Sequence, residues 1–94
     1  MSELRKMLTP DQRRRIKRIA GAFERDFEER DPFWEAKRIL LKPEQFEQAT
    51  LDTLKDIGPD YSALAEFEPD PRSEYRNGAE LLADVEALQR DGLL

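Results

Sequence analysis

The stretch TPDQRRRIKRIAGAFERDFEER, residues 9–30, decides the fold class, because it joins a helix start to an apolar stripe at helical spacing. Thr9 is suited to cap a helix, Pro10 fits the first helical position, and Gln12 can complete a capping box. The apolar residues that follow recur every three or four positions: Ile16, Ile19, Ala20, Phe23 and Phe27. Residues 9–30 are therefore predicted to form one amphipathic helix with a basic outer face.

Prolines mark where helices stop and start in the middle of the chain. The residue before a proline is pushed out of the helical region, so Asp31-Pro32 ends the first helix and opens the next. Residues 32–67 are predicted to form central helices, with a break at Pro43 and another at Gly58-Pro59.

The last third of the chain contains a linker and a final helix. Residues 68–73, EPDPRS, carry two prolines and predict an exposed linker. Asn77 and Glu80 fit a capping box, and Gly92 supplies a C-terminal stop. An acidic amphipathic helix is therefore predicted over residues 77–91.

The predicted fold class is all-α, because no segment alternates apolar and polar residues as a strand would. A chain of 94 residues has side chains for one core, and its short connections favour neighbouring helices packed at angles. We expect a compact single-domain bundle of four to five short helices over residues 1–94, preceded by a flexible N-terminus over residues 1–8.

Apolar residues are scarce, since 38% of the chain is hydrophobic and 39% is charged. A domain of this size buries only about 60–65% of the surface that its unfolded chain exposes. Such a chain often completes its core by association. We therefore expect a protein partner, or a homo-oligomer.

The composition removes most kinds of active site. The chain has no cysteine and no histidine, which excludes disulfides, thiolate nucleophiles and zinc sites of the usual ligand types. Its serines lack the context of a nucleophile elbow. With 21 acidic residues in the chain, pairs of carboxylates at helical spacing are expected by chance and do not indicate a site. We expect no catalytic residue, no metal and no cofactor, and a protein that is not an enzyme.

No segment reads as a membrane span. The longest apolar run, Ile39-Leu40-Leu41, is far shorter than the roughly 20 residues that cross a bilayer. The N-terminus lacks the apolar region of a signal peptide. These features predict a cytoplasmic protein.

The net charge of -5 conceals a division between the two halves of the chain. Residues 1–42 hold twelve Lys/Arg against eight Asp/Glu, a charge of +4. Residues 43–94 hold four against thirteen, a charge of -9. This asymmetry indicates a polyanion or acidic partner at one end and a basic partner at the other, or two halves that neutralise each other.

The basic cluster of the first helix is the sharpest local feature. Its members are candidate contacts for nucleic acid or another polyanion: Arg13, Arg14, Arg15, Lys17, Arg18 and Arg25. Arg14 and Arg18 are like charges four residues apart, which costs roughly 0.2–0.5 kcal/mol, and cations in the first turns oppose the helix dipole. Three alternatives would offset this cost: nucleic-acid phosphate, the acidic half of the same chain, or an antiparallel copy of the helix.

Two groups of apolar residues are candidate contacts for a protein partner. Phe33 and Trp34 are adjacent, and neighbouring helical positions diverge by about 100°, so only one of them can point fully into the core. The final helix carries a narrow apolar stripe of Leu81, Leu82, Val85 and Leu88. This stripe suits a partner's groove, and it suits packing on the chain's own helices equally well.

Two functions follow from these features. The first is a non-catalytic protein–protein interaction regulator or assembly subunit, whose acidic C-terminal half binds or masks a basic partner surface. The alternative is a nucleic-acid-binding regulator that uses the basic first helix. The second layout resembles small antitoxins, and also phage inhibitors that present acidic helices; the likeness is one of layout, since no motif identifies a family.

Overall fold

The computed structural model describes residues 8–94. The predicted flexible N-terminus over residues 1–8 lies outside this range except for Leu8, which packs against the core. Five α-helices and one 3₁₀ helix follow: α1 (Pro10–Ala22), α2 (Glu24–Arg30), α3 (Trp34–Leu40), α4 (Pro43–Ile57), η2 (Ser62–Glu66) and α5 (Gly78–Arg90). No strand occurs in residues 8–94, so the prediction of an all-α bundle of short helices is confirmed.

Capping groups fix the starts of the helices where the sequence places them. The Thr9 hydroxyl accepts a hydrogen bond from the Gln12 backbone N–H at 3.1 Å, and the Gln12 side chain accepts one from the Thr9 N–H at 2.9 Å. At the start of α5, the Asn77 side chain accepts from the Glu80 backbone N–H at 3.0 Å. These bonds satisfy backbone donors that have no partner inside a helix.

The prediction of one continuous helix over residues 9–30 is wrong, because the chain turns at Phe23 between α1 and α2. The turn lets Phe23 and Phe27 stack with their ring centroids 5.2 Å apart and brings both into the core. It also frees the Ala22 carbonyl, which accepts a hydrogen bond from the Asp70 backbone N–H at 3.0 Å. Tertiary packing therefore overrides the helical periodicity at this point.

The same hydrogen bond ties down the proline-rich segment over residues 68–73. This segment is non-helical as predicted, but it is not a freely exposed linker, since Asp70 is only 4% exposed. The Arg72 guanidinium donates to Asp70 at 3.2 and 3.1 Å, and the Arg72 backbone N–H donates at 2.9 Å. These donors hold the pKa of Asp70 at about 2.

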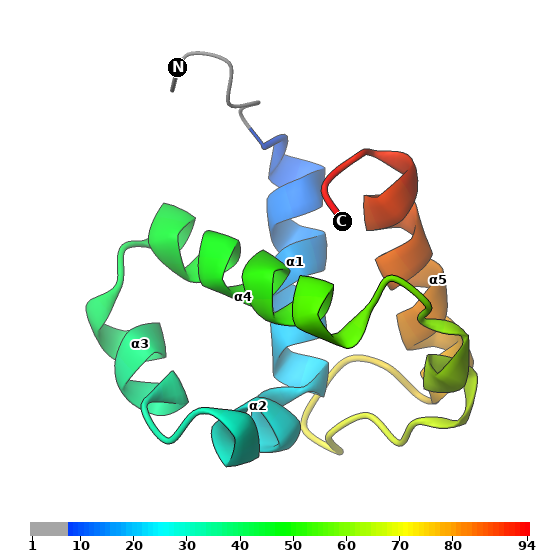
Figure 1. Cartoon of the computed structure of the whole chain (residues 1–94), viewed down its shortest axis with the longest axis horizontal. Coiled ribbons are helices and arrows are strands. Elements are labelled where there is room, and N and C mark those ends of the chain that lie inside the picture. Colours follow the sequence, from blue (N-terminus) through cyan, green and yellow to red (C-terminus); the bar gives the residue numbers. More distant parts are fainter. Residues whose placement is uncertain (1–7) are drawn as a thin grey trace.

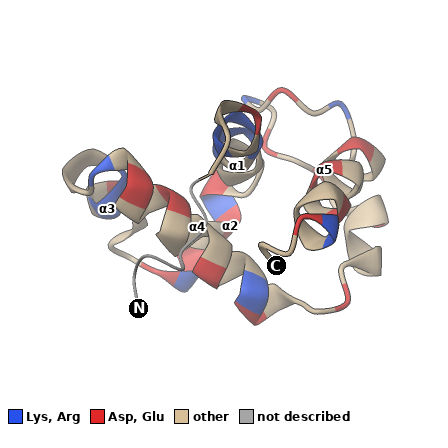
Figure 2. Cartoon of the chain, turned by 90° about the horizontal axis from the view of Figure 1, so that it is seen from above, with Lys and Arg blue, Asp and Glu red and all other residues tan. Residues whose placement is uncertain are grey.

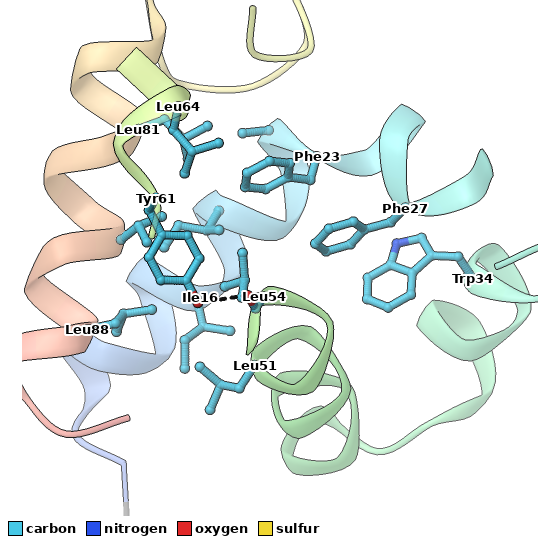
Figure 3. Packing of buried hydrophobic residues seen from close by; sticks show 13 residues of the cluster. Ile16, Phe23, Phe27, Trp34, Leu51, Leu54, Tyr61, Leu64, Leu81 and Leu88 are labelled. Atoms are coloured by element: carbon cyan, nitrogen blue, oxygen red, sulfur yellow. Dashed lines mark hydrogen bonds between the residues drawn. The ribbon is translucent and has the colours of Figure 1, made fainter. Parts of the chain in front are cut away.

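Helix α1 lies at the centre of the molecule and packs against both α4 and α5 (Figure 1). The 3₁₀ helix η2 packs against α5 as well. The core between these helices is built from aromatic and branched side chains (Figure 3): Ile16, Ile19, Ala22, Phe23, Phe27, Trp34, Leu51, Leu54, Tyr61, Leu64, Leu81, Val85 and Leu88. The Tyr61 hydroxyl enters this core and donates to the Leu54 carbonyl at 2.7 Å. Helix α3 lies at the edge of the bundle (Figure 1).

Candidate interaction surfaces

The first arginine of the basic cluster is matched inside the fold. Nε of Arg13 donates to both carboxylate oxygens of Glu47 on α4, at 3.1 and 3.0 Å. Glu47 is only 1% exposed, and a buried carboxylate is strongly destabilising unless a cation or several donors accompany it. Arg13 therefore serves as the internal partner of Glu47.

Two more arginines of the cluster meet Asp84 on α5. Nε of Arg15 lies 3.2 Å from Asp84 Oδ1, and Nη2 of Arg18 lies 3.1 Å from Asp84 Oδ2. The Tyr75 hydroxyl donates to the same carboxylate at 2.5 Å. Burial raises the pKa of Tyr75 well above its usual value, and the hydrogen bond to Asp84 raises it further. Asp84 is thus the centre of a half-buried network that joins α1 to α5.

The solvent-facing cationic surface expected on the first helix is accordingly smaller in the structure. Of the three alternatives for offsetting the basic cluster, neutralisation by the second half of the chain is what the structure shows for Arg13, Arg15 and Arg18. Arg14 is exposed and pairs with Asp11 of its own helix. Lys17 and Arg25 remain exposed, and no Asp or Glu of residues 8–94 lies within ion-pair distance of either.

The pairing of Glu47 and Asp84 with arginines was not predicted, although the sequence contains a signal for it. Asp84 follows Leu81 by three positions and precedes Leu88 by four, which places it on the apolar stripe of its helix. Glu47 precedes Leu51 and Leu54 by four and seven positions and shares their face in the same way. An acidic residue on a core-facing stripe requires an internal partner.

Most acidic groups of the second half have no such partner. Among the described residues, no Lys or Arg lies within ion-pair distance of nine exposed carboxylates, those of Glu44, Asp52, Asp56, Asp60, Glu66, Glu68, Glu74, Glu86 and Asp91. Acidic positions recur along α4, along α5 and in the loops between them (Figure 2). The acidic excess of residues 43–94 is therefore displayed at the surface.

The two groups of apolar candidates lie in different places. Leu81, Val85 and Leu88 are completely buried in the core, and Leu82 packs at its edge, so the alternative of packing on the chain's own helices is the one that the structure shows. Trp34 is 2% exposed and meets Phe27 edge to face, with the ring centroids 4.8 Å apart.

Phe33, in contrast, is 68% exposed, as expected if only one of the two adjacent aromatic residues enters the core. It belongs to an apolar surface on α3 that also includes Ile39, 71% exposed, and Leu40, 79% exposed. On the core side of the same helix, a groove of about 370 Å³ separates α3 from α1 and α4. The groove is lined by Lys17, Ala20, Gly21, Glu24, Trp34, Arg38, Leu41, Pro43 and Phe46.

None of the helices in the described part of the chain is long and apolar enough to cross a membrane. Over the same residues, no group of three or more acidic side chains is arranged to hold a metal ion. Protein-family models, curated proteins and solved structures were each compared with the chain, and none of them matches it.

Proposed function

We propose that this chain is a non-catalytic protein–protein interaction regulator or assembly subunit, whose acidic second half binds or masks a basic surface of a partner protein. One observation carries the proposal: the nine exposed carboxylates of residues 43–94 have no cationic neighbour within the described chain, while the arginines of α1 are matched internally. The arginines of α1 are thus neutralised within the fold, whereas most carboxylates of the second half have no ion-pair partner among the described residues.

Helix α4 carries acidic charges at positions that destabilise it, and an external cationic partner would offset this. Asp52 and Asp56 are like charges four residues apart, an arrangement that costs roughly 0.2–0.5 kcal/mol. Asp56 also lies in the last turn of α4, where a negative charge opposes the helix dipole at a cost of roughly 0.3–1 kcal/mol. A cationic surface placed against this face would offset both costs.

Electrostatic complementarity of this kind raises association rates and discriminates against wrong partners more than it adds affinity. The interaction is therefore expected to weaken with salt, since charges separated by more than about 10 Å are screened at 0.1 M ionic strength. Apolar contacts would supply the remaining affinity.

Nucleic-acid binding in an antitoxin-like or phage-inhibitor-like layout is the less favoured function. Within residues 8–94, Lys17 on α1 and Arg25 on α2 are the cations of the basic cluster with no Asp or Glu in ion-pair distance, and Arg14 pairs with Asp11. A duplex brought to this face would also meet a molecule that is acidic overall, with a net charge of -5.

The test compares two surface variants that leave the core unchanged. Asp52→Asn combined with Asp56→Asn neutralises part of the acidic surface, and Arg14→Gln combined with Lys17→Gln neutralises part of the remaining basic one. Each tagged protein is used for affinity capture from cell extract, and the captured partner is purified and titrated by calorimetry at about 0.05 and 0.3 M salt.

We expect a salt-sensitive protein partner that binds the wild type and the Arg14/Lys17 variant alike and binds the Asp52/Asp56 variant at least about fivefold more weakly. The acidic variant should be slightly more stable than the wild type, because it loses two unfavourable charges, so weaker binding cannot be attributed to unfolding. Capture of nucleic acid alone, lost in the Arg14/Lys17 variant, would reject the proposal in favour of the alternative.

A further inference from the structure

The groove between α1, α3 and α4 combines an apolar lining with three charged residues, and it encloses about 370 Å³. Its apolar and glycine residues are Ala20, Gly21, Trp34, Leu41, Pro43 and Phe46. Binding sites for small molecules have such a lining, with a few polar groups that orient the ligand, and their volumes begin at about 300 Å³. At about 30 Å³ for each non-hydrogen atom, the share of a water molecule in the liquid, the groove holds about ten to twelve such atoms.

One side of the groove is formed by α1 and the first residue of α2. Lys17, Gly21 and Glu24 follow one another at spacings of four and three positions, so they share a face of the chain there. At the Glu24 end, Arg38 of α3 pairs with Glu24, and this ion pair joins the two sides of the groove. A groove that is bridged at one end suits a compact molecule better than a peptide that runs through it.

The charges that line the groove leave one cation unmatched. Glu24 pairs with Arg38 and lies 3.5 Å from Arg72, so it is neutralised from both sides. Lys17 is exposed, and no Asp or Glu of residues 8–94 lies within ion-pair distance of it. Lys17, Arg38 and Glu24 together carry a charge of +1. A ligand with a single negative charge would neutralise the site, whereas a cation would be repelled by Lys17.

Gly21 keeps the backbone of α1 open to the groove. Glycine inside a helix is destabilising relative to alanine, so its presence there needs a reason. The packing of the described residues does not supply one, because a Cβ at Gly21 would meet none of their atoms within 4 Å. Close approach of a ligand to the helix backbone is a role for which glycine is suited.

We propose that the groove binds a small apolar monocarboxylate of about ten non-hydrogen atoms, with its carboxylate paired to Lys17 and its apolar body against Gly21 and Phe46. A phosphate monoester fits less well, because it would bring a charge of about -1.5 to -2 to a site with one unmatched cation. The groove is separate from the nine exposed carboxylates of residues 43–94, so this proposal does not rest on the proposed function.

The first experiment titrates the full chain with octanoate, which has about the size of the groove. Trp34 is the only tryptophan of the chain and lines the groove, so its fluorescence should change on binding. Amide signals of a ¹⁵N-labelled sample locate the site, and the largest shifts are expected at Gly21 and at the Trp34 indole. The dissociation constant should be about 0.1–1 mM for a ligand this small. Octylamine, a cation with the same alkyl chain length, should bind at least about fivefold more weakly.

The second experiment tests the charge. Lys17→Gln should weaken octanoate about three- to fivefold, as expected for a partly solvated ion pair, and should abolish the preference for octanoate over octylamine. The matched control is Arg25→Gln, which removes the same charge on α2 at an exposed position outside the groove. Like Lys17, Arg25 has no Asp or Glu of residues 8–94 within ion-pair distance. The control should bind octanoate as the wild type does.

The third experiment fills the groove from α1. Gly21→Leu should weaken octanoate at least about tenfold, and Gly21→Ala, with a smaller side chain, about two- to threefold. Both variants should melt no lower than the wild type, because the substituted position is open and both residues favour the helix more than glycine does. Weaker binding by a variant of undiminished stability shows that the groove is filled and the chain is folded.

The proposal is overturned if octanoate fails to saturate the chain up to about 10 mM, or if octylamine binds as tightly as octanoate. Octanoate binding to Gly21→Leu as to the wild type would place the ligand elsewhere and overturn it too, as would shifts confined to Phe33 and Ile39 on the outer side of α3. If the chain without ligand sediments as a dimer and the groove signals change on dilution, a second copy is the occupant and the small carboxylate is rejected.

Discussion

Replacing Asp84 by alanine removes the acceptor that joins three groups between α1 and α5. Arg15, Arg18 and Tyr75 all lose their contact with this carboxylate, which lies 20% exposed beside arginines that are 26% and 35% exposed. A hydrogen bond to a charged group contributes about 1.5–3 kcal/mol when it is shielded, and an exposed ion pair contributes about 0.2–1 kcal/mol. Counting about 1.5 kcal/mol for Tyr75 and about 0.5 kcal/mol for each arginine, we expect a loss of about 2–3 kcal/mol.

Urea denaturation followed by circular dichroism measures this loss. With an m-value of about 1 kcal/mol/M for a chain of this size, the midpoint should fall by about 2–3 M, and the melting temperature by about 10–20 °C. The matched control is Glu86→Ala, two positions away on the same helix, whose carboxylate is exposed and has no ion pair in the described chain. The control should lie within about 0.5 kcal/mol of the wild type.

The same variant tests whether internal neutralisation is what keeps the basic cluster from polyanions. Without Asp84, Arg15 and Arg18 are free, so binding to a short DNA duplex should strengthen, and the slope of log K against log salt should steepen by about 2. Equal stabilities for Asp84→Ala and Glu86→Ala would refute the network. Unchanged DNA binding in a variant that has lost stability would refute the neutralisation.

Three further predictions concern backbone positions and one carboxylate. Gly78→Ala should destabilise the fold by about 1–3 kcal/mol in urea denaturation, because its Cβ would lie 2.0 Å from the Leu64 carbonyl oxygen, and backbone cannot easily move aside. Gly21→Ala should instead stabilise the fold by about 0.5–1 kcal/mol, because a Cβ at this position meets nothing within 4 Å and alanine favours the helix. A loss of stability in this variant would contradict the open space beside α1. The pKa of Asp70, about 2 in the fold and lower than in the unfolded chain, means that stability is present above about pH 4 and is lost as the pH falls toward 2. Asp70→Asn should flatten this part of an acid titration followed by circular dichroism, and it leaves Glu24, 3.5 Å away, as the carboxylate partner of Arg72. An unchanged profile would contradict the assignment.

Local signals in the sequence predict the ends of the helices well. The capping box of Thr9 and Gln12 forms as expected, and Pro43 begins a helix that runs to Ile57, directly before Gly58. These features depend on neighbours along the chain, and a single sequence contains that information. The turn at Phe23 is different. It depends on aromatic stacking and on the Asp70 N–H, which lies 47 positions after Phe23, so the periodicity of residues 9–30 gives no sign of it.

The site was predicted less completely, because pairing of charges depends on which helices become neighbours. The sequence identifies the arginines of the cluster but leaves three kinds of partner open for them, and only the packing of α4 and α5 on α1 decides among these. The divergence of adjacent helical positions predicts that only one of Phe33 and Trp34 enters the core, but which of the two does so depends on the packing of α3. The exposure of Ile39 and Leu40 was not predicted, because an apolar run on a short helix reads as core until the position of that helix is known.

Like charges four residues apart on a helix are offset by the described residues in the first half of the chain but not in the second. In α1, the like charges of Arg14 and Arg18 are offset within the molecule, by Asp11 and Asp84, so their cost requires no external ligand. In α4, Asp52 and Asp56 have the same spacing and no Lys or Arg of the described chain within ion-pair distance. If unfavourable charge placement is maintained only where something offsets it, the offset for α4 lies outside the described residues. Under the proposed function a basic protein surface supplies it, so the acidic half is where a partner should be sought.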